Sequence, residues 1–265
     1  MSGRSVAAAC RTVLTTADPR AKLMAARAAA RDWRLGRLER AFDVAMPDRP
    51  ARPATPELLP PNQMPRRGKG GTERARIAML HALAHIEFVA IDLAFDLIGR
   101  FGRDYPPAFI DEWMRVGADE AMHFALLDRR LRLLGSHYGA LPAHDGLWQA
   151  AEETAGDGLA RLAVVPMVLE ARALDITPSM IVRFRDAGDA PSARILQRIM
   201  GDEIRHVRAG TTWFVWAANR RGQDAAKYYQ ILVKRHFRGA VKPPFNDSAR
   251  DEAGLTRDFY VALAT

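Results

Sequence analysis

The sequence lacks the features that are typical of secreted and membrane-spanning proteins. Its single cysteine, Cys10, rules out an internal disulfide bond and indicates a reducing compartment, so we expect a cytoplasmic protein without a membrane partner. The longest apolar segment, residues 77–98, carries five ionisable side chains: His81, His85, Glu87, Asp92 and Asp96. Such a segment is a poor membrane span and indicates a buried helix with a site on it. Because no segment alternates apolar and polar residues as a strand would, we expect an all-α fold.

Acidic residues are fewer than basic ones, and the formal net charge is +8. A positive surface can attract nucleic acid or anionic substrates. Arginine far outnumbers lysine, however, and the codons of a GC-rich genome would give the same excess. The charges are scattered apart from a cluster of Arg66, Arg67 and Lys69 in an expected loop. Base composition is therefore the favoured explanation, and a nucleic-acid partner is the alternative.

Composition divides the chain into four parts. Residues 1–46 are rich in alanine and arginine and predict a helical extension. Residues 47–71 hold seven prolines and three glycines, a density that predicts an extended arm without helix or strand. Residues 72–221 predict a bundle of four helices, and residues 222–265 predict further helices packed on that bundle.

Capping and breaking residues place the four helices of the bundle. The expected helices cover residues 72–99, 108–135, 147–176 and 192–219. Gly156 and Pro166 are each able to break the third helix. Pro178 predicts the start of an additional short helix before the fourth.

Two pentapeptides share the pattern Asp-Glu-x-x-His. They are Asp119, Glu120 and His123 in the second expected helix, and Asp202, Glu203 and His206 in the fourth. Residues three apart on a helix project from the same face, so each Glu and His can bind one metal ion or bridge two. The Asp can accept the proton of the imidazole nitrogen that does not bind metal. Composition alone predicts about 0.02 such matches in this chain, and two are present.

Two further glutamates occur at the spacing that a dinuclear site needs. A bundle of this kind takes one Glu from each of two helices and a Glu-x-x-His from each of the other two. Glu87 precedes Glu120 by 33 residues, and Glu170 precedes Glu203 by the same number. Both lone glutamates have apolar neighbours, and a buried carboxylate needs a cationic partner. Two metal ions would supply it.

Simpler explanations compete with metal binding. The lone glutamates could pair with an arginine such as Arg172 or Arg205. His81 and His85 are rotated away from the lone glutamate of their helix, so we expect packing or hydrogen bonding there. Gly117 leaves space beside the expected metal ions, either as a pocket for dioxygen or a substrate or because two helices pack closely.

Longer stretches around these motifs also carry information. They are HALAHIEFVAIDLAFD, DEAMHFALLDRRLRLLGSHYGALPAHDGLW, AVVPMVLEARALDITP and GDEIRHV. These stretches resemble the ferritin-like superfamily of di-iron carboxylate proteins, and within it an uncharacterised bacterial family described as a ferritin-like domain of unknown function. The chain is more distantly similar to a bacterial di-iron tRNA hydroxylase. All six ligand positions of the superfamily are filled, by Glu87, Glu120, His123, Glu170, Glu203 and His206.

The resemblance implies a ferritin-like four-helix bundle around the two metal ions. It also implies that Arg205, which precedes His206 as in oxygen-activating relatives, pairs with Asp202 and Asp119 behind the ligands. The metal is expected to be iron, although carboxylate and imidazole ligands suit manganese or a mixed pair equally well.

The ligand set favours an oxidoreductase, of oxygenase or hydroxylase type, that uses dioxygen or peroxide on an unknown substrate. Its catalytic residues, its electron-donor protein and its state as monomer or homodimer are left open. One alternative is oxidation and detoxification of iron without an organic substrate. Another is an RNA-binding or tRNA-modifying protein.

Overall fold

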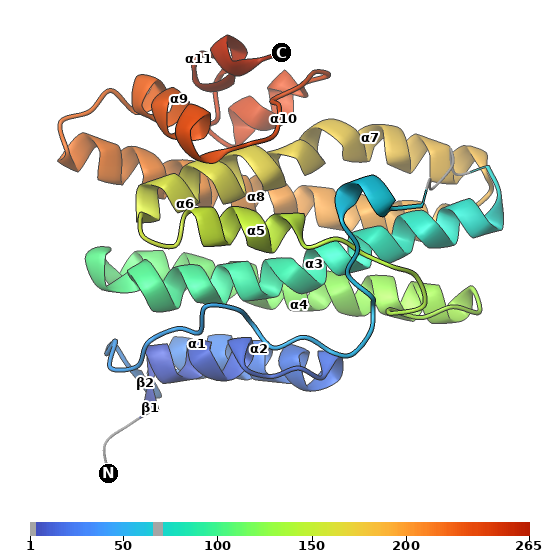
Figure 1. Cartoon of the computed structure of the whole chain (residues 1–265), viewed down its shortest axis with the longest axis horizontal. Helices are drawn as coiled ribbons and strands as arrows, with labels where there is room; N and C mark the ends of the chain where they lie inside the picture. The colour runs from blue at the N-terminus through green and yellow to red at the C-terminus, as the bar shows by residue number, and fades with distance from the viewer. Residues whose placement is uncertain (1–3, 66–70) are drawn as a thin grey trace. The chain divides into compact units, whose positions relative to one another are not determined.

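The computed structural model describes residues 4–65 and 71–265, and most of these residues lie in helices (Figure 1). Within this described part, one sheet is present, made of two parallel two-residue strands, β1 (Arg4–Ser5) and β2 (Leu38–Glu39). The expectation of an all-α fold is confirmed.

The chain forms two compact units, the first ending at Trp148 and the second starting at Gln149. Each unit is described by itself below. The division predicted from composition, with boundaries after residues 46, 71 and 221, stays a prediction. The basic cluster of Arg66, Arg67 and Lys69 lies outside the described residues.

Two long helices form the core of the first unit. They are α3 (Glu73–Phe101) and α4 (Pro107–Leu133), joined through the short 3₁₀ helix η2 (Gly102–Asp104). The Thr72 hydroxyl caps α3 by accepting a hydrogen bond from the backbone N–H of Ala75 at 3.2 Å. Pro107 occupies the first position of α4, where its missing N–H costs nothing. Both helices were expected, and their ends differ from the expected ones by two residues or fewer.

The N-terminal residues form two helices that pack on this core. In Figure 1, α1 (Val6–Leu14) and α2 (Pro19–Arg34) lie alongside α3 and α4 within the first unit. α1 contacts α3, and α2 contacts α4. The carboxylate of Asp18 caps α2 by accepting from the N–H of Ala21 at 2.8 Å.

A buried charge cluster, made of Lys22, Arg52 and Asp92, joins α2 and the Pro-rich segment to α3. The ammonium group of Lys22 and the guanidinium of Arg52 each bind one oxygen of the Asp92 carboxylate. Lys22 and Asp92 are completely buried, and both cations lie over the ring of Phe88, at 5.3 and 5.6 Å from its centre. Burial raises the pKa of Asp92 and lowers the pKa of Lys22, while each charge opposes the shift of the other.

The five ionisable residues in the apolar stretch of α3 are buried, as expected from the sequence. His81, His85, Glu87, Asp92 and Asp96 are each 5% exposed or less. The segment Glu73–Asp104 is long and apolar enough to cross a membrane, yet 72% of its most apolar stretch of 18 residues is buried inside the protein. This burial is what the core helix of a soluble protein shows.

The described residues of the Pro-rich segment run mainly as extended chain. Leu58 forms a bridge with Ala143, and Arg49 pairs with Asp145, so the segment is held to the end of the first unit. One short 3₁₀ helix, η1 (Pro61–Gln63), interrupts it. The expectation of no helix in this segment is wrong at these three residues, because proline fits the first turn of a helix.

The second unit is centred on two helices that pack on each other, α7 (Ala171–Asp186) and α8 (Ala190–Arg220). α5 (Gly146–Glu153) crosses the boundary between the units. The remaining elements are α6 (Gly158–Val164), the π-helical segment η3 (Val165–Glu170), α9 (Ala225–His236), α10 (Asp247–Glu252), α11 (Arg257–Tyr260) and the 3₁₀ helix η4 (Val261–Leu263). α6 contacts both α8 and α9.

The third expected helix, residues 147–176, is interrupted at one place and changes to π-helical turns at another. It stops after α5 and restarts at α6, where the Asp157 carboxylate accepts from the N–H of Leu159 at 2.9 Å. Pro166 lies in η3, where the chain widens to π-helical turns but does not break. The ring of Pro166 packs against Gly210 of α8, so close that a Cβ on Gly210 would lie 2.5 Å from it.

The expected short helix starting at Pro178 is wrong, because α7 continues through this residue. Pro178 has no N–H to donate to the carbonyl of Leu174, one turn earlier. The side-chain amide of Asn246 donates to that carbonyl instead, at 3.1 Å. A contact 72 residues away in the sequence therefore satisfies the carbonyl that the proline leaves open.

Candidate metal centre

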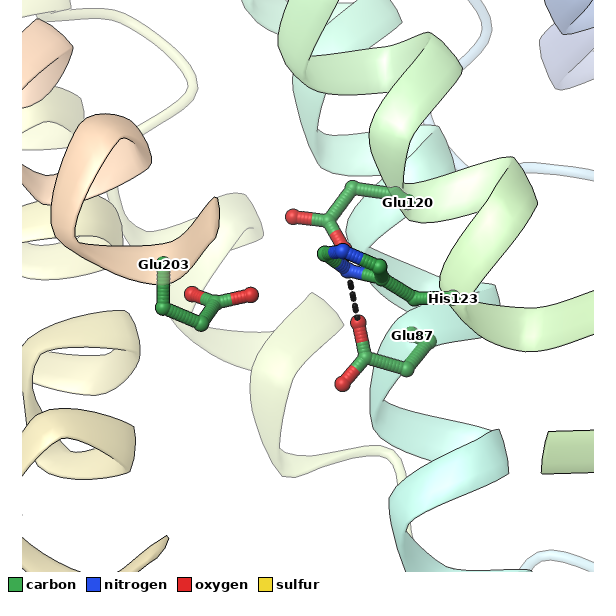
Figure 2. Close-up of side chains that lie close together, drawn as sticks. All are labelled: Glu87, Glu120, His123 and Glu203. Carbon is green, nitrogen blue, oxygen red and sulfur yellow. Dashed lines mark hydrogen bonds and ion pairs between the residues drawn. The ribbon is translucent and has the colours of Figure 1, made fainter. Parts of the chain in front are cut away.

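Three of the six predicted ligands come together in the first unit. Glu87 lies on α3, and Glu120 and His123 lie one turn apart on α4. One ligand atom from each falls within 4.8 Å of the other two. The Nδ1 atom of His123 is 3.2 Å from Oε2 of Glu87 and 3.2 Å from Oε2 of Glu120. Figure 2 shows the two carboxylates beside the imidazole ring, together with Glu203, which belongs to the second unit and is described with it below.

These three side chains are withdrawn from water. Glu87 is 5% exposed, Glu120 is 1% exposed and His123 is fully buried. Burial, followed by the negative charge of Glu120, raises the pKa of Glu87 well above its usual value, and His123 opposes the rise. Two neighbouring carboxylates stabilise a divalent cation because they supply the charge and the oxygen atoms that it binds. The group therefore fits a metal ion.

The orientation of His123 separates its two ring nitrogens. Nδ1 faces the two carboxylates and is the atom placed to bind a metal ion. Nε2 is then left to donate a hydrogen bond, which orients the ring. Asp119 is four residues earlier on the same helix. Its assignment as the acceptor of that hydrogen bond stays a prediction.

Gly117 lies one turn before Glu120 and reflects close helix packing. A Cβ at this position would lie 2.6 Å from the ring of Phe95, which belongs to α3 and is fully buried. Of the two explanations for this glycine, the close packing of α3 on α4 is confirmed, and the pocket for dioxygen or substrate stays a prediction.

His81 and His85 make hydrogen bonds, as expected. Nε2 of His81 accepts from the backbone N–H groups of Gly139 and Leu141, at 2.9 and 3.4 Å. Nδ1 of His85 is 3.0 Å from the hydroxyl of Tyr138. Burial is the main cause that lowers the pKa of His81 to about 4 and the pKa of His85 to about 3. Both rings are therefore neutral at pH 7.

Two more predicted ligands lie one turn apart on α8, in the second unit. Oε1 of Glu203 is 3.4 Å from Nδ1 of His206, and both side chains are buried. Nδ1 again faces the glutamate, as it does in the first unit. The preceding Asp202 accepts hydrogen bonds from Arg198, at 2.7 Å, and from Arg205. The predicted pairing of Arg205 with Asp202 is confirmed, and its pairing with Asp119 stays a prediction.

The sixth predicted ligand, Glu170, is the last residue of η3. It is half-buried, and its joining to Glu203 and His206 stays a prediction. π-helical turns are rare and often occur at functional sites. The arginines considered as partners of the lone glutamates have other contacts: Arg172 donates to the carbonyls of Lys242 and Pro244, at 2.7 and 3.1 Å.

Sequence reasoning missed the cluster of Lys22, Arg52 and Asp92. Asp92 stood out as an acidic residue in an apolar helix, which signals a buried partner. Its partners are 70 and 40 residues away, and no helical spacing connects them.

Comparison with known proteins identifies relatives of unknown activity. The family model described as "Protein of unknown function (DUF455)" matches residues 15–261. An uncharacterized protein of Haemophilus influenzae is 40% identical over 211 residues, which cover 77% of this chain and 73% of the relative. No solved structure matches the chain.

Proposed function

We propose that this chain, which belongs to the DUF455 family of proteins of unknown function, is a dinuclear metal protein of the ferritin-like class and an oxidoreductase. The observation that carries the proposal is the buried convergence of Glu87, Glu120 and His123 on one point. The same Glu-x-x-His pattern on α8 and the repeated 33-residue spacing support a second, matching half-site.

In this proposal Glu87, Glu120 and His123 hold one side of a metal pair, and Glu170, Glu203 and His206 hold the other side. Four glutamates balance the four positive charges of two divalent ions. When bound, a ferrous pair would supply the electrons that reduce dioxygen or peroxide. Iron is the first expectation, with manganese or a mixed pair as alternatives.

The protein's own residues have three tasks in this proposal. The carboxylates bind the ions, and the burial of the ligands excludes bulk water from them. His123 and His206 each turn Nδ1 toward a glutamate of the same helix. Arg198 and Arg205 fix the carboxylate of Asp202, which keeps it in place behind the α8 ligands.

Metal content is the direct test. The protein is purified from cells supplied with iron and manganese, and bound metal is measured by mass spectrometry. We expect about two ions per chain, almost none in a Glu120→Ala, Glu203→Ala double variant, and an unchanged content in Glu112→Ala. Glu112 lies on α4 two turns before Glu120 and serves as the control. A folded wild-type protein that retains no metal would contradict the proposal.

The reaction is tested by the consumption of dioxygen after anaerobic loading with ferrous iron. An oxidoreductase that acts on a substrate consumes about one dioxygen per pair of irons and then stops until an electron donor is added. Repeated oxidation of added ferrous iron, with release of ferric iron, would instead support iron detoxification.

A groove on the first unit favours RNA as a second candidate partner. It has a volume of about 960 Å³, lies between α2 and α4, and is lined by Trp33 and four arginines, Arg27, Arg31, Arg34 and Arg115. Within the described part of the chain, three of these arginines, Arg27, Arg34 and Arg115, have no ion pair. Cationic grooves with an aromatic ring bind single-stranded nucleic acid. This candidate predicts RNA binding that weakens with salt. The binding should be lost in an Arg27→Gln, Arg34→Gln double variant and kept in Arg129→Gln.

A further inference from the structure

A pocket of about 240 Å³ opens in the first unit between the Pro-rich segment and α3. Its polar wall includes Arg52, His85 and Tyr138, and its apolar wall includes Pro53, Pro56 and Leu58. An apolar cavity of about 150 Å³ already accommodates benzene. The pocket therefore has room for a small molecule with one ring or a short aliphatic chain.

Two buried donors in this wall lack a well-formed hydrogen bond within residues 4–65 and 71–265. Nη2 of Arg52 has no hydrogen-bond partner there. Nε2 of His85 makes no hydrogen bond of good geometry, and its nearest polar neighbour is the backbone of His144, which raises the pKa of the ring slightly against the effect of burial. The side chain of His85 is only 4% exposed, and leaving a buried polar atom without a partner is costly. The other nitrogen of the ring, Nδ1, is 3.0 Å from the Tyr138 hydroxyl. When that hydroxyl donates to Nδ1, the ring proton lies on Nε2, which makes Nε2 a donor.

The charge around the pocket is unbalanced. Lys22 and Arg52 both bind the single carboxylate of Asp92, so this buried cluster carries one net positive charge. Glu57 also lines the pocket, but it is exposed and can be solvated. Buried positive charge without a matching anion is unfavourable, so an anion in the pocket would stabilise the cluster.

We propose that this pocket binds a small organic carboxylate whose body is a single ring or a short chain. Its carboxylate accepts hydrogen bonds from Nη2 of Arg52 and Nε2 of His85. Its apolar body lies against Pro53, Pro56 and Leu58. The apolar wall distinguishes such a ligand from an inorganic oxyanion, which has no surface to bury there.

The test is calorimetric titration of the full-length protein with benzoate, benzyl alcohol and inorganic phosphate. We expect benzoate to bind, and benzyl alcohol to bind about tenfold or more weakly because it lacks the charge that Arg52 recognises. Phosphate that binds as tightly as benzoate would overturn the assignment to carboxylates. A protein that binds none of the three at millimolar concentration would overturn the site.

Substitutions locate the binding to this pocket. Arg52→Gln removes one donor and leaves Lys22 and Asp92 as a balanced pair, so we expect a folded protein with benzoate affinity reduced by about tenfold or more. Tyr138→Phe removes the partner of His85 Nδ1 and is expected to weaken binding as well. Arg129→Gln, which alters an exposed arginine of α4 that does not line the pocket, is the control and should bind as the wild type does.

Equal benzoate affinity in Arg52→Gln and wild type would overturn the proposal. Metal content is measured on the same variants and should stay unchanged, because none of the altered residues is a proposed metal ligand. Failure of the carboxylate site is therefore distinguishable from failure of the metal site.

Discussion

A histidine nitrogen that accepts hydrogen bonds cannot carry a proton at the same time. Nε2 of His81 accepts from two backbone N–H groups, those of Gly139 and Leu141, in the turn that follows α4. Protonation of this nitrogen would break both bonds and place a charge in a buried position. The lowered pKa of His81, to about 4, agrees with this geometry.

His81 should therefore make the stability of the protein depend on pH. The pKa is lowered in the folded state, so between pH 6.5 and about 4 the unfolded chain binds a proton that the folded chain does not. We expect this group to lower the free energy of unfolding by about 3 kcal/mol as the pH decreases through this range, and to lower it no further below it. Urea unfolding at several pH values measures the effect.

The control for this prediction is His81→Gln, whose amide oxygen can accept a hydrogen bond but does not titrate. The variant should lose part of the pH dependence, and His85 should retain its own contribution. Identical pH profiles for variant and wild type would show that His81 does not cause the effect.

At the scale of helices, local signals predicted most starts and stops, and distant contacts decided the exceptions. Thr72 and Asp18 cap the helices that follow them, as short-range chemistry requires. Pro178 carries the same local signal for a helix start, but α7 runs through it. The amide that compensates for the proline belongs to Asn246, whose position near α7 is set by the fold of the second unit. No pattern around Pro178 contains that information.

Two glycines inside helices should respond in opposite ways to the same substitution. In Gly117→Ala the new methyl group collides with the buried ring of Phe95, so we expect a loss of about 1–3 kcal/mol in the free energy of unfolding. In Gly201→Ala on α8 the methyl group meets no atom within 4 Å, and the lower entropy of the unfolded chain should add about 0.5–1 kcal/mol.

Chemical unfolding of both variants, followed by circular dichroism, tests this pair of predictions. A stabilised Gly117→Ala would mean that α3 and α4 adjust their packing without cost. Metal content measured on the same sample would then show whether Glu120, one turn away, keeps its position.

At the scale of the whole molecule, the sequence predicted two half-sites, and each has members that meet. Glu87, Glu120 and His123 come together in the first unit, and Glu203 and His206 come together in the second. Helical spacing was enough to place ligands on one helix. The convergence of Glu87 with the α4 ligands depends on how α3 packs on α4, and the repeated spacing anticipated it. The charge cluster of the first unit has no such regularity and could not be anticipated.

The proposed metal pair takes ligands from both units, so the proposal predicts that metal binding couples their unfolding. We expect the metal-loaded protein to unfold in one calorimetric transition, and the metal-free protein to unfold at lower temperature in two. At a metal concentration about a thousandfold above Kd, the stabilisation is about 4 kcal/mol. If metal raises only one of two unfolding temperatures in the wild-type protein, a site shared by both units is contradicted. In Glu203→Ala we expect metal to raise only one of the two unfolding temperatures.

The contact between Lys22 and Asp92 has a consequence for the minimal length of a functional fragment. The helices that carry the proposed metal ligands begin at residue 73, which makes this residue the simplest start for a transplanted fragment. A fragment that begins at residue 73 would lack both Lys22 and Arg52, so it would leave the buried Asp92 carboxylate without a cation and would uncover the face of α4 on which α2 packs. Transplantation of the proposed metal centre into another scaffold must therefore include the residues that carry Lys22 and Arg52, or replace Asp92 with an apolar residue.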